Sequence, residues 1–112
     1  MFTKRQEQVA GLIQEELSQL FINKFNGLVP KRLVTITVVR MSPDLSLAKV
    51  YLSIFPSTDG DKIIKELNNH VAKVRFELGN VIKNSVRHIP ELVFYLDDSL
   101  DYLDRINKAI NS

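Results

Sequence analysis

The chain has 112 residues, with 15 Lys and Arg against 13 Asp and Glu, a formal net charge of +2. This length fits one domain over residues 1–112, and a hydrophobic fraction of 45% with 25% charged residues favours a packed core over a disordered chain. The absence of cysteine excludes disulfides, thiolate chemistry and cysteine-based zinc sites. No apolar stretch has the length of a signal peptide or a membrane span, so we expect a cytoplasmic protein without membrane association.

The positive charge is concentrated in one part of the chain. Residues 1–90 contain 13 Lys and Arg against 8 Asp and Glu, whereas residues 91–112 contain 2 against 5. A basic region separated from an acidic tail favours a polyanionic partner. An ordinary mixed, solvated surface is the alternative interpretation.

Apolar side chains predict a first helix that ends at Gly27 and Pro30, since glycine suits a helix cap and proline cannot continue a helix. They recur every three or four residues, the spacing of one buried helix face. They comprise Val9, Leu12, Ile13, Leu17, Leu20, Phe21 and Phe25.

Two strands are predicted next, over residues 33–41 and 48–55. The first is rich in Val, Ile and Thr, and the second alternates apolar and polar side chains. Ser42 and Pro43 suit the first two positions of a type I turn between them. We therefore expect a β-hairpin.

A longer helical region is predicted after the loop 56–60, in which Thr58 or Asp59 can cap it. Its apolar residues step by three or four and the pattern ends before Ile89 and Pro90. Periodicity leaves open whether this region is one helix or two that meet at a kink.

A third strand, 92–96, and a short C-terminal helix capped by residues 97–99 complete the prediction. The helices and strands in this order give an α+β layout with helices on one face of a small sheet.

Residues suited to catalysis are sparse. His70 and His88 lie 18 residues apart with no nearby pattern of metal ligands. The four glycines form no phosphate loop, and no serine stands in a nucleophile elbow. Asp97 and Asp98 are interpreted as a helix cap and not as a cation site. We predict that the protein is no enzyme and uses no cofactor, metal or small-molecule substrate.

The long helical region is also the most basic part of the chain. Its charged residues are Lys62, Lys65, Lys73, Arg75, Lys83 and Arg87, against Glu66 and Glu77. Cations on a helix beside a sheet edge can follow RNA phosphates. RNA binding is therefore the leading hypothesis from the residues alone, and protein–protein docking is the second.

Several short motifs, in order along the chain, resemble those of the ribosome-binding factor A family. They run collinearly from about Arg5 to Asp104 and nearly span the chain. They comprise Ser42, Asp44-Leu45, Ala48-Lys49-Val50-Tyr51 and Ser53 in the hairpin; Arg75, Leu78-Gly79, Arg87 and Pro90-Glu91-Leu92 after it; and Phe94 with Asp97-Asp98-Ser99-Leu100.

The resemblance implies a type II KH-like fold of order α-β-β-α-kink-α-β. It also implies binding to the small ribosomal subunit and its 16S-type rRNA near the 3′ end, which would assist late maturation, rRNA processing and cold adaptation. The family has an Ala-x-Gly kink between the two helices, and the aligned residues here, His70-Val71-Ala72, depart from it.

We expect a monomer whose basic face contacts RNA phosphates without covalent chemistry, with the shape of the rRNA setting most of the specificity. For two of its residues, Arg75 and Arg87, the alternatives are a solvated helix face or an ion pair with Glu77 or Glu91. The runner-up function is a protein–protein docking module with a KH-like fold. The predicted RNA contacts are Lys4, Arg5, Lys73, Arg75, Lys83 and Arg87.

Overall fold

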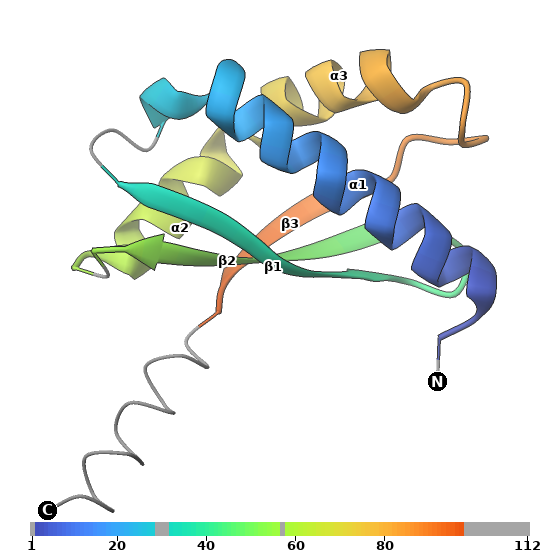
Figure 1. Cartoon of the computed structure of the whole chain (residues 1–112), viewed down its shortest axis with the longest axis horizontal. Coiled ribbons are helices and arrows are strands. Elements are labelled where there is room, and N and C mark those ends of the chain that lie inside the picture. The colour runs from blue at the N-terminus through green and yellow to red at the C-terminus, as the bar shows by residue number, and fades with distance from the viewer. Residues whose placement is uncertain (1, 29–31, 57, 98–112) are drawn as a thin grey trace, which may run out of the picture.

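A computed structural model describes residues 2–28, 32–56 and 58–97 (Figure 1). Its strands form one sheet of order β1-β2-β3, in which β1 and β2 are antiparallel while β2 and β3 are parallel. The α+β prediction is confirmed, and the predicted C-terminal helix lies outside the described residues. The elements are α1 (Lys4–Asn23), a 3-10 turn η1 (Asn26–Leu28), β1 (Leu33–Met41), β2 (Leu47–Phe55), α2 (Gly60–Asn69), α3 (Val71–Ile82) and β3 (Glu91–Leu96).

Helix α1 starts with a capping box. The Thr3 hydroxyl accepts the backbone N–H of Gln6 at 3.1 Å, and the Gln6 side-chain oxygen accepts the N–H of Thr3 at 2.7 Å. The Gln6 amide also donates to the carbonyl of Met41 at 3.0 Å, which ties the start of α1 to the end of β1. The helix ends at Asn23 and not near Gly27, although Phe25 stays buried beyond its end.

The predicted hairpin is confirmed, and its turn is held by Asp44. The N–H of Leu45 donates to the Ser42 carbonyl at 2.9 Å, which closes a four-residue turn. The Asp44 carboxylate accepts the hydroxyls of Ser42 and Ser46, each at 2.7 Å, and the N–H of Ser46 at 3.1 Å. These hydrogen bonds, led by the one from the Ser42 hydroxyl, lower the pKa of Asp44 to about 2.

The long helical region is two helices that meet at His70. This residue has φ −107° and ψ 14°, and its carbonyl accepts the N–H of Lys73 at 3.1 Å as α3 begins. Asp59 is the N-cap of α2, as one alternative predicted, but its side chain makes no capping hydrogen bond. The helical region was predicted to end just before Ile89 and Pro90, and this end is wrong because α3 stops at Ile82.

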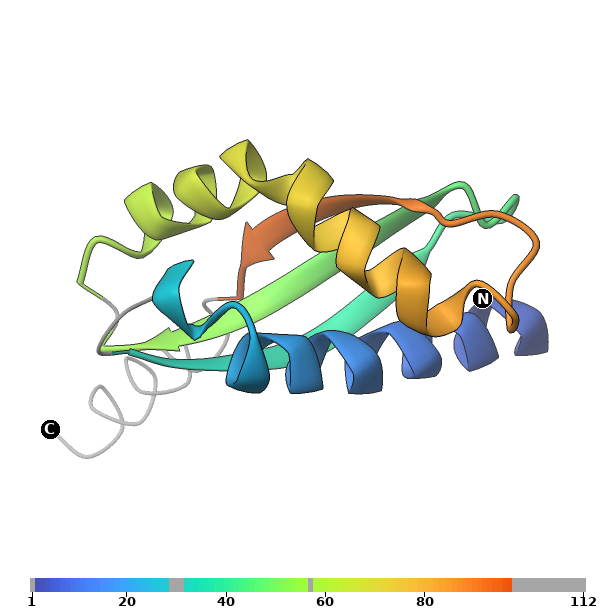
Figure 2. The ribbon, with the colours of Figure 1, turned by 90° about the horizontal axis from the view of Figure 1, so that it is seen from above.

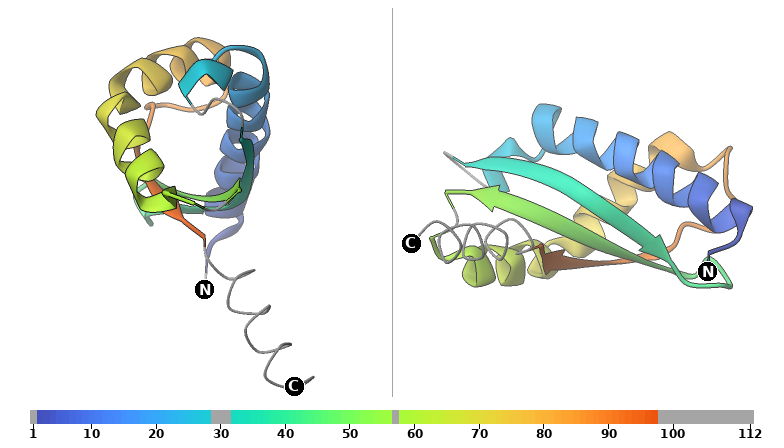
Figure 3. Two further views of the ribbon diagram at one scale, coloured as in Figure 1. Left: turned by 90° about the vertical axis from the view of Figure 1, so that its left-hand side faces the viewer. Right: turned by 60° about the horizontal axis from the view of Figure 1, so that its bottom comes forward.

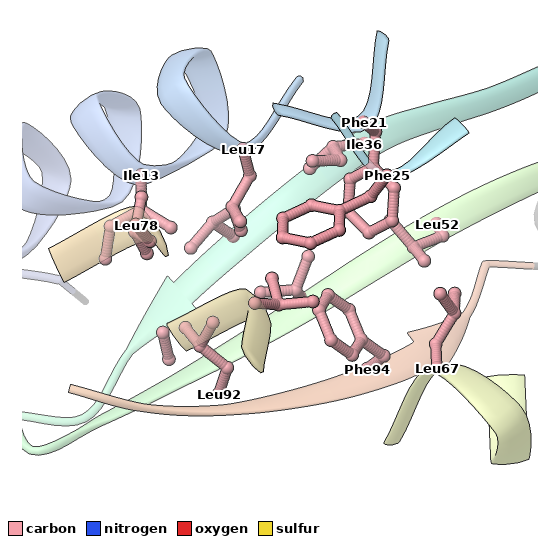
Figure 4. Close-up of a cluster of buried hydrophobic side chains, with 14 of the residues drawn as sticks. Ile13, Leu17, Phe21, Phe25, Ile36, Leu52, Leu67, Leu78, Leu92 and Phe94 are labelled. Carbon is pink, nitrogen blue, oxygen red and sulfur yellow. The ribbon is translucent and has the colours of Figure 1, made fainter. Parts of the chain in front are cut away.

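The helices α1 and α3 lie on one side of the sheet, and α2 borders the edge strand β3 (Figures 1 and 2). Between helices and sheet, aromatic rings meet edge to face (Figure 4). The ring centroids of Phe21 and Phe25 are 6.2 Å apart, and those of Phe21 and Phe94 are 6.0 Å apart. Burial of each such side chain stabilises the fold by about 1.5–3 kcal/mol.

Asn68, near the end of α2, forms hydrogen bonds with the backbone of the edge strand β3. Its side-chain oxygen accepts the N–H of Phe94 at 2.9 Å, and its amide donates to the Phe94 carbonyl at 3.0 Å. The side chain thus takes the place that a neighbouring strand would occupy and satisfies both backbone groups of a buried residue. Nothing in the local sequence pattern indicates this pairing.

Candidate nucleic-acid interface

A hollow of about 1020 Å³ lies where the start of α1, the β1–β2 turn and the segment 83–90 meet. In Figure 2 the first turns of α1 lie beside the chain that follows α3. Arg5, Arg75 and Arg87 all line this hollow, although they come from α1, α3 and the segment 83–90. We call it the arginine hollow. It brings together three of the six residues predicted to contact RNA.

Two of the three arginines hold the segment 83–90 in place. Arg75 donates from Nε to the Pro90 carbonyl at 2.9 Å and from Nη2 to the Ile89 carbonyl at 2.6 Å. Arg5 donates from Nη2 to the Ser85 carbonyl at 3.2 Å. Hydrogen bonds from a charged group to a backbone carbonyl stabilise a fold by about 1.5–3 kcal/mol when partly buried, and less at exposed sites.

Neither ion pair considered for Arg75 is formed within the described residues, since its guanidinium bonds backbone carbonyls instead. Glu77, one of the two acids considered, pairs with Lys24 at 2.7 Å. Arg87 has neither a hydrogen bond nor an ion pair among the residues that the structure describes, and its side chain is exposed. Arg87 is therefore the arginine of this hollow whose charge is free for a ligand.

The lysines predicted as RNA contacts lie outside the arginine hollow. Lys4 begins α1 beside Arg5, Lys73 is in the first turn of α3, and Lys83 directly follows that helix. All three side chains are exposed. They surround the hollow's elements without lining it, so they would contribute long-range positive potential to a ligand in the hollow more than direct contacts.

The lining of the hollow has mixed chemistry. Its three arginines face two carboxylates, those of Asp44 and Glu91. Because the pKa of Asp44 is lowered to about 2 by its serine hydrogen bonds, this acid is ionised at neutral pH. With both carboxylates ionised, the net charge of the residues that line the hollow is only +1. Apolar residues, among them Val9 and Ile89, make up part of the lining. Phosphate binding here would depend on where the guanidinium groups lie, and little on bulk charge.

The described part of the chain contains neither a group of metal ligands nor a membrane-spanning helix. No group of three or more His, Cys, Asp and Glu side chains there could hold a metal ion. Within the same residues, no helix is both long enough and apolar enough to span a membrane.

No sequence pattern indicates the acceptors that position the arginines. These are the carbonyls of Ser85, Ile89 and Pro90, which any residue type supplies. A carbonyl leaves no signature in a sequence, so this part of the site could be found only from the tertiary structure.

The element order, with one antiparallel and one parallel strand pair and two helices meeting at a kink, defines a KH-like domain of type II. Solved structures share this fold. The crystal structure of ribosome-binding factor A from Thermus thermophilus matches with a TM-score of 0.64 at 22% identity, over 81% of this chain and 94% of that one. A solution structure from Thermotoga maritima matches with a TM-score of 0.51 at 26% identity, over 77% and 84%.

The chain belongs to the ribosome-binding factor A family, as its motifs predicted. The model of that family matches residues 5–110. Ribosome-binding factor A of Cytophaga hutchinsonii is 43% identical over 111 residues, which cover 99% of this chain and 84% of the relative. That of Christiangramia forsetii is 37% identical over 113 residues, with 96% and 83% covered.

A further structural match comes from a ribosome complex. A Thermus thermophilus ribosome-binding factor A fitted into an electron-microscopy map of its 30S complex matches with a TM-score of 0.58 at 23% identity, over 86% of this chain and 94% of that one. At this identity the match shows the shared fold alone.

Proposed function

We propose that this protein binds the small ribosomal subunit, contacts its 16S-type rRNA near the 3′ end, and assists a late step of subunit maturation. The observation that carries the proposal is family membership across residues 5–110. The Thermus thermophilus relative fitted into a 30S complex supports the choice of the small subunit. In this proposal the protein acts in the cytoplasm as a monomer, supports rRNA processing and cold adaptation, and catalyses no reaction.

The binding mechanism that the geometry favours is non-covalent. Arg87 is exposed at the arginine hollow and would donate to an RNA phosphate. Arg5 and Arg75 have further N–H groups beyond those that bond the segment 83–90, and these would donate to neighbouring phosphate oxygens. Lys4, Lys73 and Lys83 would add attraction around the hollow. A preformed site of this kind selects RNA by shape more than by base identity.

Sedimentation of cell extract through a sucrose gradient tests the proposal. We expect the protein to travel with free small subunits and to be depleted from translating ribosomes, because a maturation factor leaves before translation. An even distribution through polysomes, or a position at the top of the gradient at low salt, would contradict the proposal.

The apolar part of the hollow favours a second candidate, a docking module for a protein. The half-buried side chains of Leu45, Val86 and Ile89 line the same hollow as the arginines. An apolar patch with a charged rim is also typical of protein–protein interfaces. The dependence of binding on salt separates the two candidates.

A further inference from the structure

The sheet has one face that no described helix covers. The right-hand view of Figure 3 shows the strands from this side. Side chains alternate along a strand, and those opposite the core are exposed or half-buried. We call this surface the open sheet face and define it by Arg40 on β1, Lys49 and Tyr51 on β2, and Tyr95 on β3.

Two positive charges stand directly opposite each other on this face. Arg40 pairs with Lys49 in the antiparallel register of β1 and β2, and both side chains are exposed. Like charges at directly opposed positions destabilise a sheet, and an acidic residue at either position would relieve the cost. Neither residue forms an ion pair with any part of the chain that is described. The pair is therefore a cost to the fold that a bound anion would remove.

Arg40 on β1 begins a row of side chains that continues as aromatic rings on β2 and β3. The Arg40 guanidinium lies 6.0 Å from the ring centroid of Phe2 and 5.9 Å from that of Tyr51. Tyr51 stacks on Tyr95 with centroids 5.4 Å apart and ring planes 25° apart. The row runs Phe2, Arg40, Tyr51, Tyr95, and its last ring is 40% exposed on the edge strand.

Two acidic groups also border this face. Glu91 shares the exposed side of β3 with Tyr95 by strand alternation. Asp97 follows β3 and accepts a hydrogen bond from the Thr37 hydroxyl. Thr37 belongs to β1, so the Asp97 carboxylate also lies near the first strand. The positive charge of this face is concentrated at Arg40 and Lys49, so the phosphates of an anionic backbone would lie over that pair.

We propose that the open sheet face binds a single-stranded segment of RNA. Its phosphates lie over Arg40 and Lys49, and a base stacks on Tyr95 and extends the row of rings. Single-stranded nucleic acid is bound by this combination of cations along the backbone and aromatic rings under the bases. The inference rests on the proposed function in taking RNA as the partner, but none of its RNA contacts lines the arginine hollow.

The test compares two charge-matched double variants. Binding of a fluorescently labelled single-stranded RNA of mixed sequence is measured by anisotropy at low salt. Arg40→Gln with Lys49→Gln should weaken binding by about tenfold or more, because two phosphate contacts are lost. Lys62→Gln with Lys65→Gln removes the same charge from two exposed positions on α2 and should weaken it less than about twofold.

A second pair of variants, at Tyr95 and at Phe76, tests whether a base stacks on Tyr95. Tyr95→Val should weaken binding by about fivefold or more, as expected for loss of one stacked base. Phe76→Val removes a ring that is 67% exposed on α3 and should leave binding unchanged. Valine keeps strand propensity at residue 95, and the thermal midpoint of each variant is measured so that unfolding is not mistaken for lost affinity.

The outcomes separate this inference from the proposed function. If the parent fails to bind single-stranded RNA, or if both charge variants lose affinity equally, the open sheet face is not an RNA site. Sedimentation with small subunits, measured on the same proteins, then judges the proposed function separately. If the Tyr95 variant leaves the subunit while the parent binds no free RNA strand, the face docks a ribosomal protein and the inference is overturned.

Discussion

Arg75 and Arg87 border the same hollow but use their side chains differently. The guanidinium of Arg75 donates to two backbone carbonyls, at 2.6 and 2.9 Å, and so fixes the path of the chain into β3. Arg87 lies on the segment that Arg75 holds, with its own charge exposed. A residue that positions the site and a residue that contacts the ligand should respond differently to the same charge reversal.

We expect Arg87→Glu to change the unfolding free energy by less than about 0.5 kcal/mol, as for an ordinary surface substitution. Its affinity for small subunits should fall about tenfold, because reversing a charge beside a phosphate costs on the order of 1–2 kcal/mol. Arg75→Glu should instead lower the unfolding free energy by about 1–3 kcal/mol. Urea unfolding and subunit binding measure the two effects, with Lys65→Glu on α2 as the control for charge alone.

The opposite pattern would contradict this division of roles. If Arg75→Glu unfolds at the parent's urea midpoint, its hydrogen bonds to the segment 83–90 do not stabilise the fold. If Arg87→Glu binds small subunits as tightly as the parent does, the arginine hollow is not the phosphate site.

Asp44 makes the hairpin turn sensitive to acid. Its pKa is lowered from 3.8 to about 2 by hydrogen bonds, first from the Ser42 hydroxyl and next from that of Ser46. Because the folded-state pKa lies below the ordinary value, the stabilisation is fully present above about pH 4. It is lost as the pH falls through the folded pKa.

Ser42→Ala should therefore raise the pKa of Asp44 toward 3.8, which a carboxyl titration by NMR measures directly. Asp44→Asn should lower the urea midpoint at pH 6, and the difference from the parent should narrow steadily below about pH 4. A difference that stays constant down to pH 2.5 would show that the ionised carboxylate does not stabilise the turn.

At the scale of elements, the break between α2 and α3 forms without glycine. His70 has a non-helical backbone, and Ala72 is already the second residue of α3. The departure from the family's Ala-x-Gly kink therefore does not abolish the kink. Because the helix is interrupted at His70, residue 72 has an ordinary helical backbone. A glycine there would therefore relieve no strain.

Ala72→Gly should lower the unfolding free energy by roughly 0.5–1 kcal/mol, since it only adds backbone entropy to a helical position. Gly11→Ala in the middle of α1 is the opposing control. A Cβ there meets nothing within 4 Å, so this change should raise the unfolding free energy by a similar amount. A stabilised Ala72→Gly variant would mean instead that the kink is strained by its alanine.

For the whole molecule, the partner's chemistry should appear in the salt dependence of binding. Contacts to several phosphates release counterions, so affinity for small subunits should fall steeply between about 50 and 200 mM salt. An apolar protein interface built on Val86 and Ile89 would change little over this range. Isothermal binding measurements at four or more salt concentrations distinguish the two.

A charge-removing control belongs to the same experiment. Asp101→Asn with Asp104→Asn, in the acidic part of the chain outside the described residues, should leave subunit affinity unchanged or slightly raised. Loss of affinity in this variant would show that the acidic end binds a protein partner.

Most helix and strand identities could be read from the sequence because they depend on local patterns. The apolar spacing of α1 and the alternation of β2 each predict one buried face, and the Ser42-Pro43 pair predicts the turn. The end of α3 could not be predicted. Apolar residues continue past Ile82, but they belong to the non-helical segment 83–90. Arg5 and Arg75 hold that segment by hydrogen bonds to its carbonyls.

The sequence by itself determined the order of the elements, the buried faces and the family, because each rests on residues near one another in the chain. Only the tertiary structure decided that Arg5, Arg75 and Arg87 share one hollow, since chain folding brings together residues as many as 82 positions apart. It also decided that Arg40 faces Lys49, because the register of a hairpin follows from how its turn closes, and the hydrogen bonds that close this turn are seen only in the structure.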